Sequence, residues 1–373
     1  MGGERRRDDL KFMLRALDLA RRGLYTASPN PMVGAVLVKG GRVIAEGWHE
    51  RVGGPHAEAV AIERAGEEAR GSTLYVNLEP CCIHGHTPPC TDIIIRAGVR
   101  RVVVATRDPN PLVDGRGIER LKAAGVEVVE GVLKEEAERL NEQFLTYMRE
   151  GRPLFSLKFA MTLDGKIASK TGASKWITSE EGRREAHELR AQHDAIMVGV
   201  GTVLSDDPLL VPHMLDFRPE RPRLRVVVDS NLRTPPKARL LSGGGPPVLV
   251  AAGEGADREK AEALRRKGAE VVFLPRDERG KVDLRALSKL LWERKVLGVL
   301  CEGGGTLAWS LLRAGLVDKV YAFVAPKIMG GQSARTPVEG EGFDSPDLSL
   351  KFRVEEVRRV GPDVLIVAYP ERG

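Results

Sequence analysis

The chain has 373 residues, 42% of them hydrophobic and 29% charged, and carries a formal net charge of +6. This length predicts two or three domains, and the balance of residue types is that of a globular protein. The positive charge favours an anionic substrate or cofactor, but its spread along the chain argues against a nucleic-acid-binding patch. Because the chain has no apolar stretch of about 18 residues and no apolar signal core, we expect neither a membrane span nor secretion.

In the first half, the apolar residues alternate between helical and strand periods. They predict helices over 10–23, 56–69, 90–98, 118–124 and 134–149, and strands over 33–38, 43–47, 73–78, 101–105 and 126–130. This order predicts a mixed sheet with helices on both faces. The last helix ends in Glu150-Gly-Arg-Pro153, where glycine and proline favour a linker, so we place the domain boundary there.

The second half begins afresh with a strand over 154–160. Helices are predicted near 179–192, 257–267, 283–293 and 305–314, and strands near 194–199, 224–229, 247–252, 269–274, 297–301 and 318–324. One or two further strands are expected over 352–369. The pattern predicts a second α/β domain whose sheet is predominantly parallel.

The four cysteines are unevenly spaced, since Cys81, Cys82 and Cys90 lie within ten residues of sequence and Cys301 lies far away. Such spacing is a poor disulfide framework and favours a metal cluster. We therefore expect a reducing, cytoplasmic environment.

The motif His56-Ala-Glu58, followed by Pro80-Cys81 and by Cys90, predicts a catalytic zinc site. One imidazole and two thiolates form a three-ligand set that leaves a fourth position for water. His56 follows Gly53-Gly-Pro55 at a predicted helix start, and Cys90 starts another helix, where exposed amide groups favour a thiolate. Glu58 is the candidate proton carrier, and the whole pattern is typical of zinc-dependent deaminases.

Other interpretations of these residues, as a structural zinc site or as ordinary core residues, remain open. A structural zinc normally has four protein ligands, and His84 or His86 could supply the fourth. The cysteines could also be ordinary buried apolar residues. Among functions, a nucleic-acid base deaminase with an appended binding domain would need basic and aromatic residues around its pocket, yet aromatic residues make up only 5% of the chain. A zinc-stabilised binding module without catalysis would have no use for Glu58.

In the second half, two glycine-rich turns follow predicted strands, Gly199-Val-Gly-Thr202 and Gly303-Gly-Gly-Thr306. The second turn opens a helix, whose backbone amides would suit a pyrophosphate. Neither turn is the dinucleotide fingerprint, so each one alone is equally consistent with an ordinary tight turn.

Taken together, the motifs resemble those of the bifunctional riboflavin-biosynthesis deaminase–reductases along essentially the whole chain. Thr87-Pro-Pro-Cys90, with eight residues between Cys81 and Cys90, separates this family from cytidine and tRNA-adenosine deaminases. The other shared motifs are Asn30-Pro31, Asp108-Pro-Asn110, Thr162-Leu-Asp-Gly-Lys166, Ser174-Lys-Trp-Ile177, Asp206-Asp-Pro208 and Glu302-Gly-Gly304.

The resemblance implies a cytidine-deaminase-like three-layer α/β/α domain over 1–150 and a dihydrofolate-reductase-like α/β domain over 151–373. It implies that the first domain uses one zinc ion to deaminate 2,5-diamino-6-ribosylamino-4(3H)-pyrimidinone 5′-phosphate hydrolytically. The second domain would then use NADPH to reduce the ribosyl side chain, which gives 5-amino-6-ribitylaminouracil 5′-phosphate. Members of the family assemble as dimers or tetramers through the reductase half.

The resemblance also implies roles for particular residues. In the deaminase, His56, Cys81 and Cys90 are the zinc ligands, Glu58 is the proton shuttle, and the substrate contacts are Asn30, His49, Asp108 and Asn110. The residues expected at the cofactor are Ala160, Trp176, Thr202, Asp206, Ser230, Gly303, Gly304 and Gly305. Those expected at the reductase substrate are Ser174, Arg190, Leu210 and Glu302.

The chain departs from the family pattern in two places. In the substrate loop of the deaminase, Cys82, Ile83 and His86 replace the usual serine, histidine and basic residue. After the Asp-Asp-Pro motif, His213 stands where the family often has arginine. Histidine binds phosphate less well than arginine, which has a permanent charge and can make two parallel hydrogen bonds.

Overall fold

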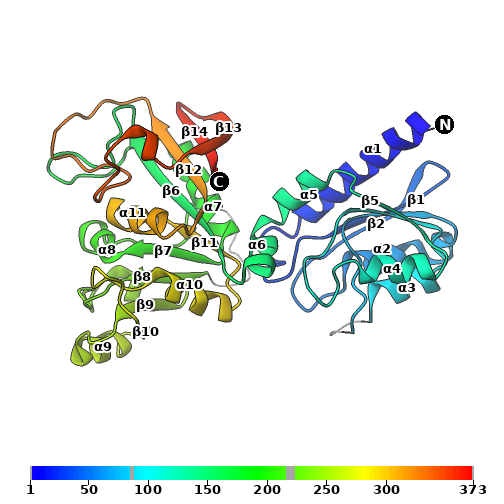
Figure 1. Ribbon diagram of the computed structural model, residues 1–373, viewed down its shortest axis with the longest axis horizontal. Coiled ribbons are helices and arrows are strands. Elements are labelled where there is room, and N and C mark those ends of the chain that lie inside the picture. Colours follow the sequence, from blue (N-terminus) through cyan, green and yellow to red (C-terminus); the bar gives the residue numbers. More distant parts are fainter. Residues whose placement is uncertain (1, 85–87, 216–222, 372–373) are drawn as a thin grey trace. The chain divides into compact units, whose positions relative to one another are not determined.

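The computed structural model describes residues 2–84, 88–215 and 223–371. The chain divides into two compact units, Met1–Gly151 and Arg152–Gly373 (Figure 1). No helix in the described ranges is both long and apolar enough to cross a membrane.

The first unit contains a five-stranded sheet in the order β2-β1-β3-β4-β5. Strand β1 is antiparallel to β2 and β3, whereas β3, β4 and β5 run parallel. The strands are β1 (Gly34–Lys39), β2 (Arg42–Trp48), β3 (Thr73–Leu78), β4 (Arg101–Thr106) and β5 (Glu127–Glu130). The helices are α1 (Gly2–Arg21), α2 (Ala57–Ala65), α3 (Cys90–Arg96), α4 (Arg116–Ala123), α5 (Lys134–Leu140) and α6 (Glu142–Glu150).

Helices cover both faces of this sheet, as the sequence predicts. Helices α1 and α5 pack on one face through a cluster that includes Met13 and Ala137. Helices α2, α3 and α4 pack on the other through a cluster that includes Ala61, Ile94 and Leu121 (Figure 1). The three-layer α/β/α architecture is therefore confirmed.

Helix α2 lies directly against the sheet because Gly47 in β2 has no side chain. A Cβ atom at this position would lie 2.4 Å from the carbonyl oxygen of Ala57 and 2.7 Å from the amide nitrogen of Ala61. The close approach fixes the first turn of α2, and this turn carries His56 and Glu58.

The helix predicted over 134–149 is in fact two helices, because Asn141 interrupts it. The Asn141 side chain accepts a hydrogen bond from the Met32 amide at 2.8 Å and donates one to the Met32 carbonyl at 2.9 Å. Asparagine readily exchanges helical backbone bonds for side-chain bonds of this kind. The break therefore anchors the loop that carries Asn30.

The second unit contains a nine-stranded sheet in the order β10-β9-β8-β7-β11-β6-β12-β14-β13. The first seven strands in this order run parallel, and β14 and β13 are antiparallel additions at one edge, so the predicted predominance of parallel strands is confirmed. The strands are β6 (Leu154–Thr162), β7 (Ala195–Gly199), β8 (Leu224–Val228), β9 (Val248–Gly253), β10 (Ala269–Leu274), β11 (Gly298–Cys301), β12 (Val317–Ala325), β13 (Phe352–Val360) and β14 (Asp363–Pro370). The helices are α7 (Glu180–Gln192), α8 (Val200–Asp206), α9 (Arg258–Arg265), α10 (Leu284–Glu293) and α11 (Gly305–Arg313). Short 3-10 turns lie at Arg239–Leu241 and Pro346–Leu348 in this unit and at Gly66–Ala69 in the first.

Alternate residues of the parallel strands face two separate layers of helices. On one face, α10 and α11 pack against residues such as Met197 and Val299. On the other, α8 and α9 pack against Ile196 and Val198, and α7 packs against Leu300. Helix α8 was not predicted from the sequence, and it shows that residues 199–202 lead directly from β7 into a helix.

Candidate active sites

The predicted zinc ligands come together in the first unit. His56 is the residue before α2, Cys81 follows the end of β3, and Cys90 is the first residue of α3. The Nδ1 atom of His56 lies 3.2 Å from Cys90 Sγ and 3.5 Å from Cys81 Sγ. All three potential ligand atoms lie within 4.8 Å of one another.

These distances are close to the spacing of ligand atoms around a tetrahedral zinc ion. Zinc–sulfur bonds of about 2.3 Å and zinc–nitrogen bonds of about 2.0 Å place the ligand atoms of such a site roughly 3.5–3.8 Å apart. The hydrogen bond with Cys90 contributes most to lowering the pKa of the Cys81 thiol to about 4, which favours the thiolate form that binds metal. His84 is exposed and is not part of the cluster, and His86 lies outside the described residues.

Glu58 lies beside this cluster without belonging to it. Its side chain interacts electrostatically with His56 and Cys81, and it is only 3% exposed. Burial is the main reason why the pKa of its carboxyl group is raised. A raised pKa helps a carboxyl group both to accept and to release a proton near neutral pH.

Asn30 and His49 form a chain of hydrogen bonds that ends at Pro55, the residue before His56. Asn30 Nδ2 lies 3.0 Å from His49 Nε2, and His49 Nδ1 lies 3.1 Å from the carbonyl oxygen of Pro55, the residue before His56. Burial lowers the pKa of His49. A neutral imidazole that donates through Nδ1 and accepts at Nε2 satisfies both contacts.

Asp108 and Asn110 lie on a loop that Glu79 holds in place. The buried Glu79 carboxylate accepts backbone hydrogen bonds from Asp108, Gly115, Gly117 and Ile118 at 2.9–3.3 Å. Because Glu79 stands two residues before Cys81, it links this loop to the metal cluster. Burial raises the pKa of Asp108 to about 6, and the charge of Cys81 acts in the same direction.

In the loop that follows Cys81, Ile83 is exposed, and Cys82 Sγ contacts the carbonyl oxygen of Leu112 at 3.8 Å. Neither side chain supplies a charge for a phosphate. Arg120 is close, because its guanidinium donates to the Cys82 carbonyl at 3.4 Å and also pairs with Asp92.

In the second unit, Arg190, Glu302 and Lys158 form a buried charge cluster. Arg190 donates two hydrogen bonds to the Glu302 carboxylate, at 2.5 and 2.9 Å, and Lys158 Nζ lies 3.4 Å from the same group. Burial opposes the ionisation of Glu302, but the charges of Arg190 and Lys158 outweigh it and lower its pKa to about 2. His187 lies 3.4 Å from Arg190, and its ring contacts that of His213 edge-on.

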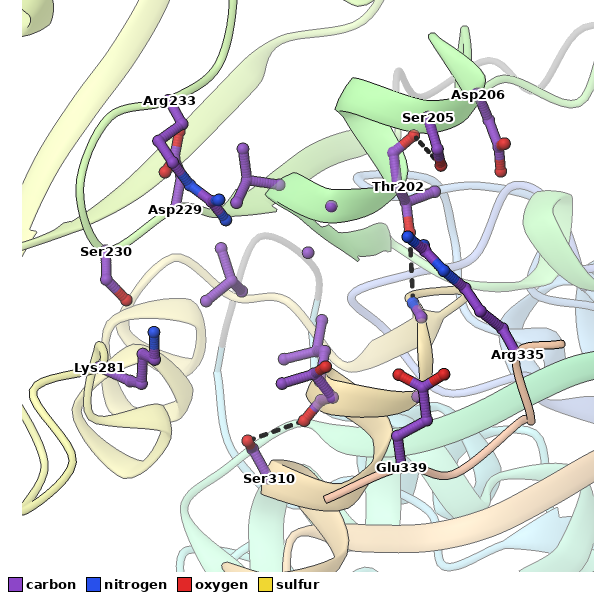
Figure 2. A pocket seen from close by; sticks show the side chains of 18 of the residues that line it. Thr202, Ser205, Asp206, Asp229, Ser230, Arg233, Lys281, Ser310, Arg335 and Glu339 are labelled. Atoms are coloured by element: carbon purple, nitrogen blue, oxygen red, sulfur yellow. Dashed lines mark hydrogen bonds between the residues drawn. The ribbon is translucent and has the colours of Figure 1, made fainter. Parts of the chain in front are cut away.

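A cavity of about 400 Å³ opens at the carboxyl ends of the parallel strands (Figure 2). Ligands of open α/β sheets bind at this edge. Residues of the two glycine-rich turns, which lead into α8 and α11, line it. Thr202 Oγ1 accepts a hydrogen bond from the Gly304 amide at 3.2 Å and so joins the two turns. Gly303 lies where the two turns meet, and a Cβ atom at this position would lie 2.8 Å from the Leu307 side chain.

Not all of the predicted reductase residues line the cavity. Those that do are Thr202, Asp206, Ser230, Gly304, Gly305 and Ser174, and Ser174 Oγ donates to Asp206 at 3.2 Å. Those that do not are Ala160, Trp176, Gly303, Arg190, Leu210 and Glu302. Ala160 packs near the α7 cluster, Leu210 is buried, and Trp176 is 63% exposed with its ring 4.5 Å from the guanidinium of Arg183.

Three cations that the motif analysis did not single out also line the cavity. They are Arg233, Lys281 and Arg335, which come from three separate loops. Arg233 could have been found as a basic residue shortly after a predicted strand, whereas nothing in the local sequence marks Lys281 or Arg335.

Comparison with known proteins adds independent evidence. Residues 153–366 match the family model described as RibD C-terminal domain, and residues 6–106 match the cytidine and deoxycytidylate deaminase zinc-binding region. The riboflavin biosynthesis protein RibD of Aquifex aeolicus is 45% identical, with 96% of this chain and 97% of that protein covered. The corresponding protein of Actinobacillus pleuropneumoniae is 44% identical over 96% of this chain and 94% of its own length.

A solved structure matches along the whole chain as well. It is the diaminohydroxyphosphoribosylaminopyrimidine deaminase/5-amino-6-(5-phosphoribosylamino)uracil reductase of Thermotoga maritima, which is 39% identical with a TM-score of 0.86. The match covers 98% of this chain and 99% of that one. Fold and site thus define a zinc-dependent deaminase joined to a reductase. The chain belongs to the RibD family and is a bifunctional enzyme of riboflavin biosynthesis.

Proposed function

We propose that the first unit hydrolytically deaminates 2,5-diamino-6-ribosylamino-4(3H)-pyrimidinone 5′-phosphate. His56, Cys81 and Cys90 would hold the zinc ion, which when bound supplies the acidity that makes water a nucleophile near neutral pH. Glu58 accepts a proton from the water and passes it to the ring nitrogen. It then takes the remaining proton from the hydroxyl group that has added to the ring carbon and gives it to the departing amino group. The carbon–nitrogen bond breaks, ammonia leaves, and a ring carbonyl remains.

The observation that carries this proposal is the position of Glu58. The carboxyl group is buried beside three metal-ligand side chains and is not one of them. A purely structural zinc site would not need such a group, whereas a hydrolytic deaminase needs a proton carrier. Asn30, His49, Asp108 and Asn110 are the proposed contacts for the substrate ring and ribose.

The second unit, in the same proposal, reduces the ribosyl group of the deaminated intermediate to a ribityl chain. NADPH, when bound, supplies the hydride. Thr202, Asp206, Ser230 and the 303–305 turn position the cofactor, together with Ala160 and Trp176. Ser174, Arg190, Leu210 and Glu302 are the proposed substrate contacts.

The test compares the wild-type chain with Glu58→Ala and with Glu63→Ala, which removes an exposed carboxylate from the same helix. Bound zinc, ammonia release and NADPH consumption are measured separately. We expect about one zinc per chain in all three proteins. Glu58→Ala should release no measurable ammonia but should still oxidise NADPH when given the deaminated intermediate. Normal ammonia release by this variant would overturn the shuttle role.

We further propose that the chain forms a homo-oligomer through the β12–β14–β13 end of the second sheet. Strand β13 is an edge strand, and its Val354 and Val357 side chains are 55% and 63% exposed. Their partners across the sheet, Ala368 and Ile366, lie on the face opposite the α7 cluster. Large exposed apolar groups on an edge strand suit a second copy of the same chain.

Light scattering of the purified protein tests this proposal. The expected mass is at least twice the 40.8 kDa of one chain. Val357→Asp should shift the population towards monomer, whereas Val43→Asp, at an exposed strand position in the first unit, should not. A monomeric wild type would contradict the proposal.

A cytoplasmic location is proposed on the same chemical grounds as the zinc site. All four cysteines are free thiols, and Cys81 and Cys90 must stay reduced to bind metal. Cell fractionation that placed the deaminase activity outside the cytoplasm would contradict this location.

A further inference from the structure

Two cations at one end of the cavity have no partner in the part of the chain that the structure describes. Arg233 and Lys281 line the cavity, and their side chains make no hydrogen bond or ion pair with any described residue. Their neighbours are engaged, since Arg276 binds backbone carbonyls and Arg279 pairs with Glu341. The cavity therefore holds two positive charges that are free to meet an anion.

Two further polar groups beside these cations also have unused hydrogen-bonding capacity. Ser230 Oγ accepts a hydrogen bond from the Val282 amide at 3.0 Å, which leaves its O–H free to donate. Asp229 Oδ2 accepts two hydrogen bonds from Thr234 at 2.7 Å, but its Oδ1 is buried and has no described partner. Asp229 is fully buried behind the cavity wall, so it contributes a negative charge beside the two cations rather than a contact that a ligand could reach.

The position of these groups matches one end of a dinucleotide. In Figure 2, Arg233, Ser230 and Lys281 lie along one side of the cavity, and Thr202, Asp206 and Arg335 lie along the other. The start of α11 also lines the cavity, and backbone amides at a helix start suit a pyrophosphate. Asp206 adjoins Ser174, a proposed substrate contact, so the nicotinamide end of the cofactor should lie on that side. Arg233 and Lys281, on the other side, would then face the adenosine end.

We propose that Arg233 and Lys281 bind the 2′-phosphate of the adenosine ribose of NADPH and make the reductase prefer NADPH to NADH. The inference rests on the proposed reductase function and assigns its cofactor discrimination to two residues. The Ser230 hydroxyl donates to the same phosphate. Asp229 alone would repel a phosphate, so the two cations decide which cofactor is bound.

The test uses the full-length chain and calorimetric titration with adenosine 2′,5′-bisphosphate and with AMP, which differ only in the 2′-phosphate. Wild type should bind the bisphosphate much more tightly. Arg233→Ala and Lys281→Ala should each weaken that binding roughly tenfold, as expected for one charge-assisted contact, and should change AMP binding by less than about twofold. Arg279→Ala removes the same charge outside the cavity and should leave both affinities unchanged.

Steady-state kinetics give a second readout. Both cavity variants should raise the KM for NADPH with little change in kcat and should leave the KM for NADH unchanged. The inference is wrong if the variants bind the bisphosphate as Arg279→Ala does, or if they lose both nucleotides equally. Failure of the reductase proposal would look different, because wild type itself would then oxidise neither cofactor in the presence of the deaminated intermediate.

Discussion

The Glu302 carboxylate is the shared counter-charge of two buried cations, Arg190 and Lys158. We expect Glu302→Gln to lower the free energy of unfolding of that unit by roughly 3 kcal/mol at pH 7, because it leaves both cations without a counter-charge. Urea unfolding of the variant measures the loss. Glu293→Gln removes an exposed carboxylate and should have little effect.

The effect of Glu302→Gln on the free energy of unfolding should depend on pH. The folded-state pKa of Glu302, about 2, lies below its ordinary value of 4.5. Its contribution to stability is therefore complete above about pH 4.5 and is lost as the pH falls towards 2. The difference in free energy of unfolding between wild type and Glu302→Gln should be constant near neutral pH and should become smaller below pH 4.5. A difference that grew on acidification would contradict this assignment of the charge.

At the scale of elements, one carboxylate holds the backbone conformation of the loop over 108–118. Glu79 Oε2 accepts from Asp108 and Gly115, and Oε1 accepts from Gly117 and Ile118. In Glu79→Gln, an amide nitrogen would face two of these N–H donors. We expect the loop to shift, so that kcat/KM for deamination falls roughly tenfold, mainly through KM.

Two measurements and a control variant separate this positioning role from a general loss of structure. Zinc content and reductase activity on the deaminated intermediate should be unchanged in Glu79→Gln, and Glu68→Gln, an exposed control, should behave as wild type. A variant that lost zinc or unfolded would show that Glu79 supports the whole unit rather than this loop.

The zinc cluster and the reductase cavity differ in how far their residues could be predicted from the sequence. The zinc cluster was predictable because His56, Cys81 and Cys90 each stand at the end of a strand or the start of a helix, where short motifs fix side-chain direction. Arg233 and Lys281 were not, because they stand on loops that meet only after the parallel strands align their carboxyl ends. The break at Asn141 was missed for a related reason, since its partner Met32 is distant in sequence.

At the scale of the whole molecule, each unit has its own hydrophobic cores. The clusters of the first unit draw on residues between Phe12 and Leu140, and those of the second on residues between Phe155 and Tyr369. A domain with its own core can fold alone, and Gly151 to Pro153 is a natural place to divide the chain. We therefore expect residues 1–151 and 152–373 to fold when they are produced separately.

The two fragments should then divide the two activities. Residues 1–151 should bind zinc and release ammonia, and residues 152–373 should oxidise NADPH with the deaminated intermediate. If the oligomer forms through β13, only the second fragment should associate, and Val357→Asp should dissociate it. Circular dichroism, zinc analysis and light scattering on each fragment check these outcomes. A first fragment that folds and binds zinc but releases no ammonia would mean that deamination needs groups from the second unit, because Glu58 and the metal ligands would all still be present.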